Sequence, residues 1–245
     1  MDNILEVNGL VKRYPAFSLD NVSFSLPEGC VTGFIGANGA GKTTTIRSIL
    51  NLAHKDAGTI KIFGLDAEEH EQEIKDRIGI VMDGSYFYND LSMRDMKSII
   101  APAYSKWSDA DYRSYMEKFE LDPKQKISTL SSGMRMKYAL VLALSHQAEL
   151  LIMDEPTSGL DTYSAYNLIK NLKDLTNMGR TVISTIHQPS SDILRLFDDM
   201  IILNQGKIIY LGEVNNLVNY FASIGYQCPE YTNPSDFIFM NILRI

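Results

Sequence analysis

The stretch Gly36–Thr43 reads GANGAGKT and fits the pattern G-x-x-x-x-G-K-[ST]. It directly follows the apolar run VTGFI and precedes the helix-like TTTIRSILNL, so we expect it to join a strand to a helix. In such a loop the glycines let backbone N–H groups curve around phosphate oxygens, while Lys42 reaches the terminal phosphates. Thr43 offers a hydroxyl to Mg²⁺ at the helix N-terminus. The stretch predicts a phosphate-binding loop in an α/β fold.

Short β-like runs recur along the chain with helical patterns between them, which favours a largely parallel sheet covered by helices. The earliest strands are hairpin-like and predict a small antiparallel subsheet. Between Ser92 and His146 the strand signal disappears, and Pro102 and Pro123 interrupt a helical pattern, so residues 92–146 are predicted to be a helical insertion. We expect one domain over 1–245 with a C-terminal tail at about 213–245. The predicted strands are Ile4–Val7, Val22–Leu26, Val31–Ile35, Thr59–Phe63, Ile78–Met82, Leu150–Asp154, Thr181–Ile186, Met200–Leu203 and Lys207–Leu211.

The composition is that of an ordinary globular protein of 245 residues, with 45% apolar and 22% charged residues. The formal charge of -7 gives no basic footprint for a nucleic acid, so we expect no nucleic acid partner. Two cysteines, Cys30 and Cys228, are too few for a disulfide framework and suit a reducing cytosol. The apolar runs are too short to cross a bilayer, and the first residues do not resemble a secretion signal.

The segment ELLIMDEPTSGLD places two carboxylates at the end of an apolar strand. Asp154 would hold Mg²⁺ there, and Glu155 would polarise a water molecule. Paired acids after a strand are common on protein surfaces. In a chain that also carries a phosphate loop, a nucleotide-hydrolysing pair is the favoured interpretation.

A third element is LSSGM, Leu130 to Met134, followed by the amphipathic segment RMKYALVLALSH. Ser131 and Gly133 would open a helix whose free N–H groups and dipole attract an anion. Alone this signal is weak, because Ser-Ser-Gly before a helix is also a good cap. Its place shortly before Asp154 makes it informative.

Together these motifs resemble the nucleotide-binding subunit of ATP-binding-cassette (ABC) transporters, over nearly the whole chain. The resemblance implies a P-loop ABC ATPase fold, with LSSGM as the signature segment and SGLD, Ser158–Asp161, as the D-loop. It also implies that ATP and Mg²⁺ are the cofactors. The implied ATP contacts are Tyr14, Gly36, Asn38, Gly39, Gly41, Lys42, Thr43, Thr44, Ser131, Gly133 and Asp161. The implied magnesium ligands are Thr43, Asp154 and Asp83, and the implied catalytic residues are Glu155, His187 and Lys42.

A histidine follows a β-branched run in TVISTIHQPSSDI, Thr181 to Ile193. A histidine at the end of a buried strand is most often a core residue. The resemblance instead places His187 at the switch position, within hydrogen-bond reach of the γ-phosphate. Pro189 helps to end the strand.

The resemblance also implies partners. Two ATPase subunits, alike or different, would meet head to tail, so that Ser131 and Gly133 of each contact the ATP held by Lys42 of the other. Closing and opening this sandwich would drive a separate transmembrane permease, an exporter, with the chain peripheral on the cytoplasmic face of the membrane.

Three positions in two motifs depart from the family pattern. Asp83 occupies the place of a glutamine that contacts Mg²⁺ and its water, and it brings a charge and a shorter reach. In the signature, Ser132 and Met134 replace the second Gly and the Gln of LSGGQ. These features of residues 1–161 resemble bacterial exporter ATPases.

Residues 162–245 resemble the eukaryotic white/pleiotropic-drug-resistance G subfamily, through IHQPSS and through the ending GYQCP…NPSDF. The change of resemblance suggests a chimera joined within DEPTSGLD. Alternatives to an exporter ATPase are a folded ATP-binding chimera with little or no transport activity and a soluble ABC-type ATPase acting on ribosomes or DNA. A P-loop kinase is disfavoured, because a kinase has no use for a signature helix or a D-loop.

Overall fold

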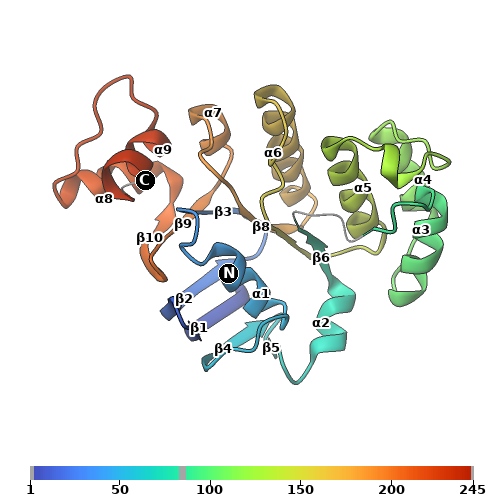
Figure 1. Cartoon of the computed structure of the whole chain (residues 1–245), viewed down its shortest axis with the longest axis horizontal. Coiled ribbons are helices and arrows are strands. Elements are labelled where there is room, and N and C mark those ends of the chain that lie inside the picture. Colours follow the sequence, from blue (N-terminus) through green and yellow to red (C-terminus); the bar gives the residue numbers. More distant parts are fainter. Residues whose placement is uncertain (1–2, 83–86, 244–245) are drawn as a thin grey trace.

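A computed structural model of the chain describes residues 3–82 and 87–243, and its strands form two sheets. The larger has the strand order β10-β9-β3-β8-β7-β6, and the smaller has the order β2-β1-β4-β5. In Figure 1 the larger sheet crosses the middle of the molecule, with the smaller sheet and α1 on one side and α5, α6 and α7 on the other. The predicted α/β class, with a mostly parallel core sheet and an antiparallel subsheet, is confirmed.

The larger sheet is parallel except for its edge strand β10, which pairs antiparallel with β9. Its central strands are buried along their whole length because apolar side chains alternate between two covered faces. In β7, for example, Leu151 and Met153 face one core cluster while Leu150 and Ile152 face another. The strands are β3 (Val31–Gly36), β6 (Ile78–Val81), β7 (Leu150–Met153), β8 (Thr181–Thr185), β9 (Asp199–Asn204) and β10 (Lys207–Glu213).

The smaller sheet is antiparallel and packs one face against the larger sheet through helix α1 (Lys42–Ile49). Its strands are β1 (Asn3–Tyr14), β2 (Phe17–Pro27), β4 (Ala57–Ile62) and β5 (Leu65–Asp66). Buried residues alternate with exposed ones along β2, as expected for a strand with one covered face. The two-residue strand β5 was not predicted.

The remaining helices fall into three groups. Helix α2 (Glu71–Arg77) precedes β6. The insertion between β6 and β7 contains α3 (Met93–Ile100), α4 (Asp109–Lys118) and α5 (Ser132–Ser145), with the 3₁₀ turns Ala101–Ala103 and Ile127–Thr129. The C-terminal half contains α6 (Thr162–Thr176), α7 (Ser191–Leu194), the 3₁₀ turn Val214–Asn216, α8 (Leu217–Ser223), α9 (Pro234–Phe237) and the π-helix Ile238–Ile242.

The insertion has an apolar core of its own, centred on the fully buried Tyr138 of α5. The Tyr138 hydroxyl donates to the Met93 carbonyl at 2.6 Å and so joins α5 to α3. Another face of α5, including Leu140 and Leu144, packs against the larger sheet. Helix α5 therefore links the insertion to the core.

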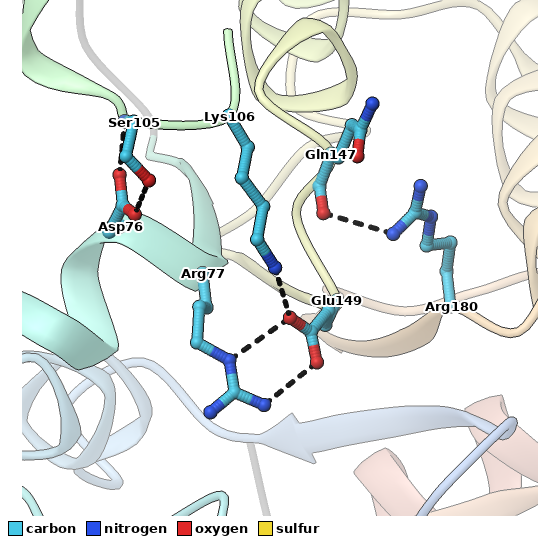
Figure 2. A network of polar contacts seen from close by, with 7 residues as sticks. All are labelled: Asp76, Arg77, Ser105, Lys106, Gln147, Glu149 and Arg180. Carbon is cyan, nitrogen blue, oxygen red and sulfur yellow. Dashed lines mark hydrogen bonds and ion pairs between the residues drawn. The ribbon is translucent and has the colours of Figure 1, made fainter.

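A polar network joins the segments at the amino ends of β6, β7 and β8 (Figure 2). The Arg77 guanidinium donates two hydrogen bonds to the Glu149 carboxylate, at 3.0 and 2.8 Å, and Lys106 lies 3.4 Å from the same group. The Arg77 hydrogen bonds hold the pKa of Glu149 below its usual range. Nearby, the Asp76 carboxylate accepts a hydrogen bond from the Ser105 N–H, and the backbone carbonyl of Gln147 accepts one from the Arg180 guanidinium. These contacts fasten the edge of the sheet opposite to the predicted site.

In the described part of the chain, residues 3–82 and 87–243, we find no helix with the length and apolar character that a membrane crossing needs.

Candidate ATP-hydrolysing site

The loop predicted to bind phosphate lies between the end of β3 and the start of α1. Gly41, the residue before α1, has a φ of 110°, which an L side chain rarely adopts. A Cβ at this position would lie 2.5 Å from Leu19 Cδ2 and 2.7 Å from Phe17 Cζ. Glycine is thus required at Gly41 by both backbone conformation and space.

The ammonium of Lys42 lies inside this loop. It donates to the carbonyls of Gly36 at 2.9 Å and Ala37 at 3.3 Å, and it lies 3.8 Å from Glu155 Oε1. The Lys42 side chain is only 5% exposed. Burial lowers its pKa, and the carboxylates of Glu155 and Asp154 oppose that shift. Lys42 therefore places a positive charge between the loop and the acidic end of β7.

Two adjoining cavities lie over the loop. The inner one has a volume of about 370 Å³, and its lining includes the predicted residues Asn38, Gly39, Gly41, Lys42, Thr43, Thr44 and Glu155. The outer one has a volume of about 820 Å³ and is lined by Tyr14, Asn38 and Gly39, among others. Tyr14 is 45% exposed at the end of β1, so its ring is available for stacking. The structure thus brings the predicted phosphate-binding residues together, with Tyr14 beside them.

Thr185, the last residue of β8, connects the two acidic residues. Its hydroxyl donates to Asp154 Oδ1 at 2.7 Å and accepts from the Glu155 N–H at 2.7 Å. Asp154 is 5% exposed and Thr185 is fully buried. Glu155 has a φ of 50°, a conformation that costs a non-glycine residue about 1 kcal/mol. The Thr185 hydroxyl helps to hold that strained residue toward Lys42.

His187 follows β8 and is exposed. β3, β7 and β8 are neighbouring parallel strands, so their carboxyl ends meet at one edge of the sheet. This edge brings together the phosphate loop after β3, the acids after β7 and His187 after β8. The His187 ring lies 5.7 Å from the ring of Phe239, between centroids, in the C-terminal π-helix.

Ser131 and Gly133 lie apart from this group. Ser131 is the exposed N-cap of α5 and accepts from the Met134 N–H at 3.2 Å. Asp161 is the N-cap of α6 and accepts from the Ser164 N–H at 2.9 Å, and its hydrogen bonds with Ser164 lower the pKa of Asp161. Figure 1 shows α5 and α6 on the opposite face of the larger sheet from α1. Within the part of the chain that the structure describes, none of the three lines either cavity over Lys42.

The oxygen atoms near Lys42 fit a magnesium ion. Thr43 supplies an exposed hydroxyl at the first turn of α1, and Asp154 supplies a carboxylate. Mg²⁺ prefers oxygen ligands and is commonly bound by one or two carboxylates, substrate phosphates and water. Among the described residues no three acidic, histidine or cysteine side chains gather as a metal cage. The predicted ligand Asp83 lies outside the described residues.

A family model described as "ABC transporter" matches residues 19–158. The chain belongs to the ABC transporter family. A second model, described as "ABC-2 type transporter", matches residues 187–244. This ABC chain is also similar to a solved "ATP binding subunit of ABC transporter", with a TM-score of 0.81, 25% identity and coverage of 97% of this chain and 98% of the other. Its fold is therefore the P-loop ABC ATPase fold, and the family implies ATP binding and hydrolysis.

Two groups of relatives are similar to this ABC chain. Human "ATP-binding cassette sub-family G member 8" is 33% identical over 89% of this chain and 35% of its own length. "Nod factor export ATP-binding protein I" of Ralstonia nicotianae is 31% identical over 89% of this chain and 69% of its own length. The chain thus spans about a third of the G-subfamily relative. The resemblance to both groups is confirmed, but each relative covers both sides of the proposed junction, so the junction stays a hypothesis.

Several residues of the ABC site were not recognised in the sequence. Thr185 reads as an ordinary β-branched strand residue, and only its place two residues before His187 distinguishes it. Phe17 lines both cavities. Its place three residues after Tyr14, the predicted adenine-stacking residue, was the one feature of the sequence that could have indicated it. Leu243 lines the outer cavity from the far end of the chain, which no local pattern indicates.

Proposed function

We propose that this chain is an ATP-hydrolysing motor that dimerises around two ATP molecules and drives a membrane exporter. The observation that carries the proposal is the inner cavity, where Lys42, Thr43 and Glu155 converge beside the phosphate loop. A triphosphate in this cavity would meet backbone N–H groups, a buried ammonium and an α1 N-terminus, all of which favour negative charge.

In this proposal Glu155 is the general base that orients the attacking water, and His187 contacts the γ-phosphate. Lys42 neutralises charge on the phosphates and orients the leaving group. Mg²⁺, held by Thr43 and Asp154 with Asp83 as a further ligand, neutralises charge on the phosphates when bound. Phosphoryl transfer requires mainly positioning and charge neutralisation from a protein, which is what these residues offer.

The dimer is supported by the position of α5. Its N-cap Ser131 is exposed and lies outside the cavities of its own chain, so its free N–H groups are open to a second molecule. Ser131, Gly133 and Asp161 would then complete the ATP site of the partner chain. Such a head-to-tail pair has two equivalent composite sites.

The test is the mass in solution of Glu155→Gln, by light scattering on a sizing column, with and without Mg-ATP. This change removes the base and keeps the size of the side chain, so it should trap ATP and double the mass. Glu155→Gln combined with Lys42→Ala is the matched control and should stay monomeric. A Glu155→Gln chain that binds ATP and remains a monomer would contradict a sandwich formed by this chain alone.

We propose that residues 1–245 act as one ABC ATPase domain on the cytoplasmic face of a membrane, with a separate permease as partner and a tail at about 213–245. By family resemblance, the helical insertion, about 92–146, and the region Asp83–Arg94 would contact that permease; residues 83–86 lie outside the described part of the chain.

A second candidate is that the chain is the ATPase part of a longer half-transporter with its own membrane domain. The match of residues 187–244 to an "ABC-2 type transporter" model favours it, as does the 35% coverage of the G-subfamily relative. The mass of the natural protein, detected with an antibody against this chain, distinguishes the two.

A further inference from the structure

The turn that carries His187 is strained. After β8 ends at Thr185, Gln188 adopts a φ of 44°. A residue before proline is normally extended, and a left-handed conformation is unfavourable for any residue other than glycine. Contacts from outside the turn are needed to keep the chain in this shape.

Those contacts come from the C-terminal segment Asn233–Leu243. The Pro189 carbonyl accepts one hydrogen bond from the Ser235 hydroxyl and a second, at 3.3 Å, from Asn233 Nδ2. Ser235 is fully buried. Asn233 also caps α9, because its Oδ1 accepts from the Ser235 N–H at 3.0 Å. A rigid three-residue unit thus holds the carbonyl that lies two residues after His187.

The same segment reaches the His187 ring and the nucleotide cavity. Phe239, which is 1% exposed, places its ring at 44° to the imidazole, 5.7 Å away between centroids. Leu243, which is 6% exposed, lines the outer cavity together with Tyr14 and Asn38. One segment therefore lies against the His187 ring and also hydrogen-bonds the backbone two residues after it.

We propose that Ser235 is a positioning residue for ATP hydrolysis: together with Asn233 it fixes the turn His187–Pro189, so that the His187 imidazole is presented to the γ-phosphate. This inference rests on the proposed role of His187. Ser235 does not touch the substrate and acts through the Pro189 carbonyl.

The first experiment compares the ATPase kinetics of Ser235→Ala with those of Ser223→Ala. The exposed Ser223 hydroxyl donates to a backbone carbonyl within the same C-terminal region, at Tyr220, so its removal is a control for the loss of a hydroxyl that does not contact the turn. We expect kcat to fall about tenfold in Ser235→Ala, the equivalent of one net hydrogen bond, while KM for ATP stays within about twofold. Ser223→Ala should behave as the wild type.

Two further readings separate positioning from general destabilisation. In the His187→Ala background, Ser235→Ala should cause no further loss of kcat, because both changes affect one unit. Asn233→Asp keeps the oxygen that caps α9 and removes the donor to Pro189, so it should also lower kcat. This variant replaces Ser235→Ala in the test if Ser235→Ala does not fold. Full additivity with His187→Ala, or unchanged kcat in folded Ser235→Ala and Asn233→Asp, would overturn the proposal.

An NMR measurement of His187 does not depend on ATPase activity. The chain has four histidines, so the imidazole NMR signals of His187 can be identified from the spectrum of His187→Gln. We expect Ser235→Ala to shift and broaden these signals and to leave those of His54 and His70 in place. If the wild-type chain hydrolyses no ATP, the proposed function fails, and this spectrum alone decides whether Ser235 positions His187. Unchanged His187 signals would refute that.

Discussion

At the scale of single residues, the buried hydroxyl of Thr185 connects the two acidic residues of the candidate site. Asp154 and Glu155 were predicted from their place after an apolar strand. Thr185, which holds both of them, was not, because the hydrogen bonds of a buried threonine depend on which strands become neighbours. Strand order is a tertiary property, and β7 and β8 lie side by side only in the folded sheet.

The first prediction concerns Thr185→Val, which keeps the shape of the side chain and removes the hydroxyl. Asp154 and the Glu155 N–H then lose a buried partner, so we expect ATPase activity to fall about tenfold and to need more Mg²⁺ for half-maximal rate. The measurement is ATPase rate against magnesium concentration. Thr181→Val, at the other end of β8, is the control; equal magnesium dependence in the two variants would contradict this role.

His146 yields a prediction about acid stability. It is the C-cap of α5, yet it is 2% exposed and stacks on Tyr104 with 3.8 Å between ring centroids. Burial lowers the pKa of His146 from 6.5 to about 4; Asp76 opposes the shift and Arg180 adds to it. The unfolded chain therefore binds more protons than the folded chain between these two values.

The contribution of His146 to stability is complete above pH 6.5 and is lost as pH falls toward 4. We expect the free energy of unfolding of the wild type to fall by about 3 kcal/mol more than that of His146→Asn between pH 7 and 4. Urea unfolding at several pH values measures the difference. His70→Asn is the exposed control, and parallel curves for wild type and His146→Asn would count against this account.

At the scale of elements, the sequence predicted most strands and helices because local patterns determine them. All nine expected strands are present. The two-residue strand β5 is too short to show a period. The hydrogen bond between the C-terminal segment and the turn His187–Pro189 joins Pro189 to Ser235, 46 positions apart. The periodicity of a helix or strand cannot predict a contact at such a separation.

The phosphate loop gives the third prediction. Gly41→Ala combines an unfavourable φ with a Cβ that would collide with Leu19 and Phe17, so we expect ATP binding to weaken at least tenfold and the melting temperature to fall. Gly64→Ala is the matched control, since Gly64 has a φ of 76° but open space around its Cβ position. Calorimetric titration with Mg-ATP measures binding. Equal effects of both changes would show that the loop does not depend on close packing at Gly41.

Ser132, one of the two departures in the signature, has a contact of its own. Its hydroxyl lies 3.4 Å from the Ser158 carbonyl, and a Cβ at Gly133 would lie 3.0 Å from Leu160 Cδ2. The signature and the D-loop are thus neighbours within one chain. In this structure Ser132 occupies the place of the second glycine without disturbing the start of α5.

At the scale of the whole molecule, a head-to-tail sandwich predicts complementation between two inactive variants. Lys42→Ala removes the ammonium from the phosphate loop of its own chain. Ser131→Arg would block the ATP site that this chain completes in its partner. A mixed pair keeps one intact site, so an equal mixture should regain roughly a quarter of the wild-type ATPase rate, since half of the pairs are mixed and each has one of two sites.

The measurement is the ATPase rate of the mixture against the sum of the separate rates. The control is a mixture of Lys42→Ala with Lys42→Ala/Ser131→Arg, in which no pair has an intact site. A mixture that is no more active than its components would contradict composite sites.

The order of strands in the larger sheet also has a consequence for synthesis of the chain. β3 carries the phosphate loop and is hydrogen-bonded on one side to β8 and on the other to β9, which end at residues 185 and 204. A nascent chain that has not yet reached β8 therefore exposes both edges of a short, mostly apolar strand, the kind of segment that pairs with other chains. Ribosomal stalling or premature termination before that point is expected to yield aggregates, and the nucleotide can protect the loop only after nearly the whole core has been made.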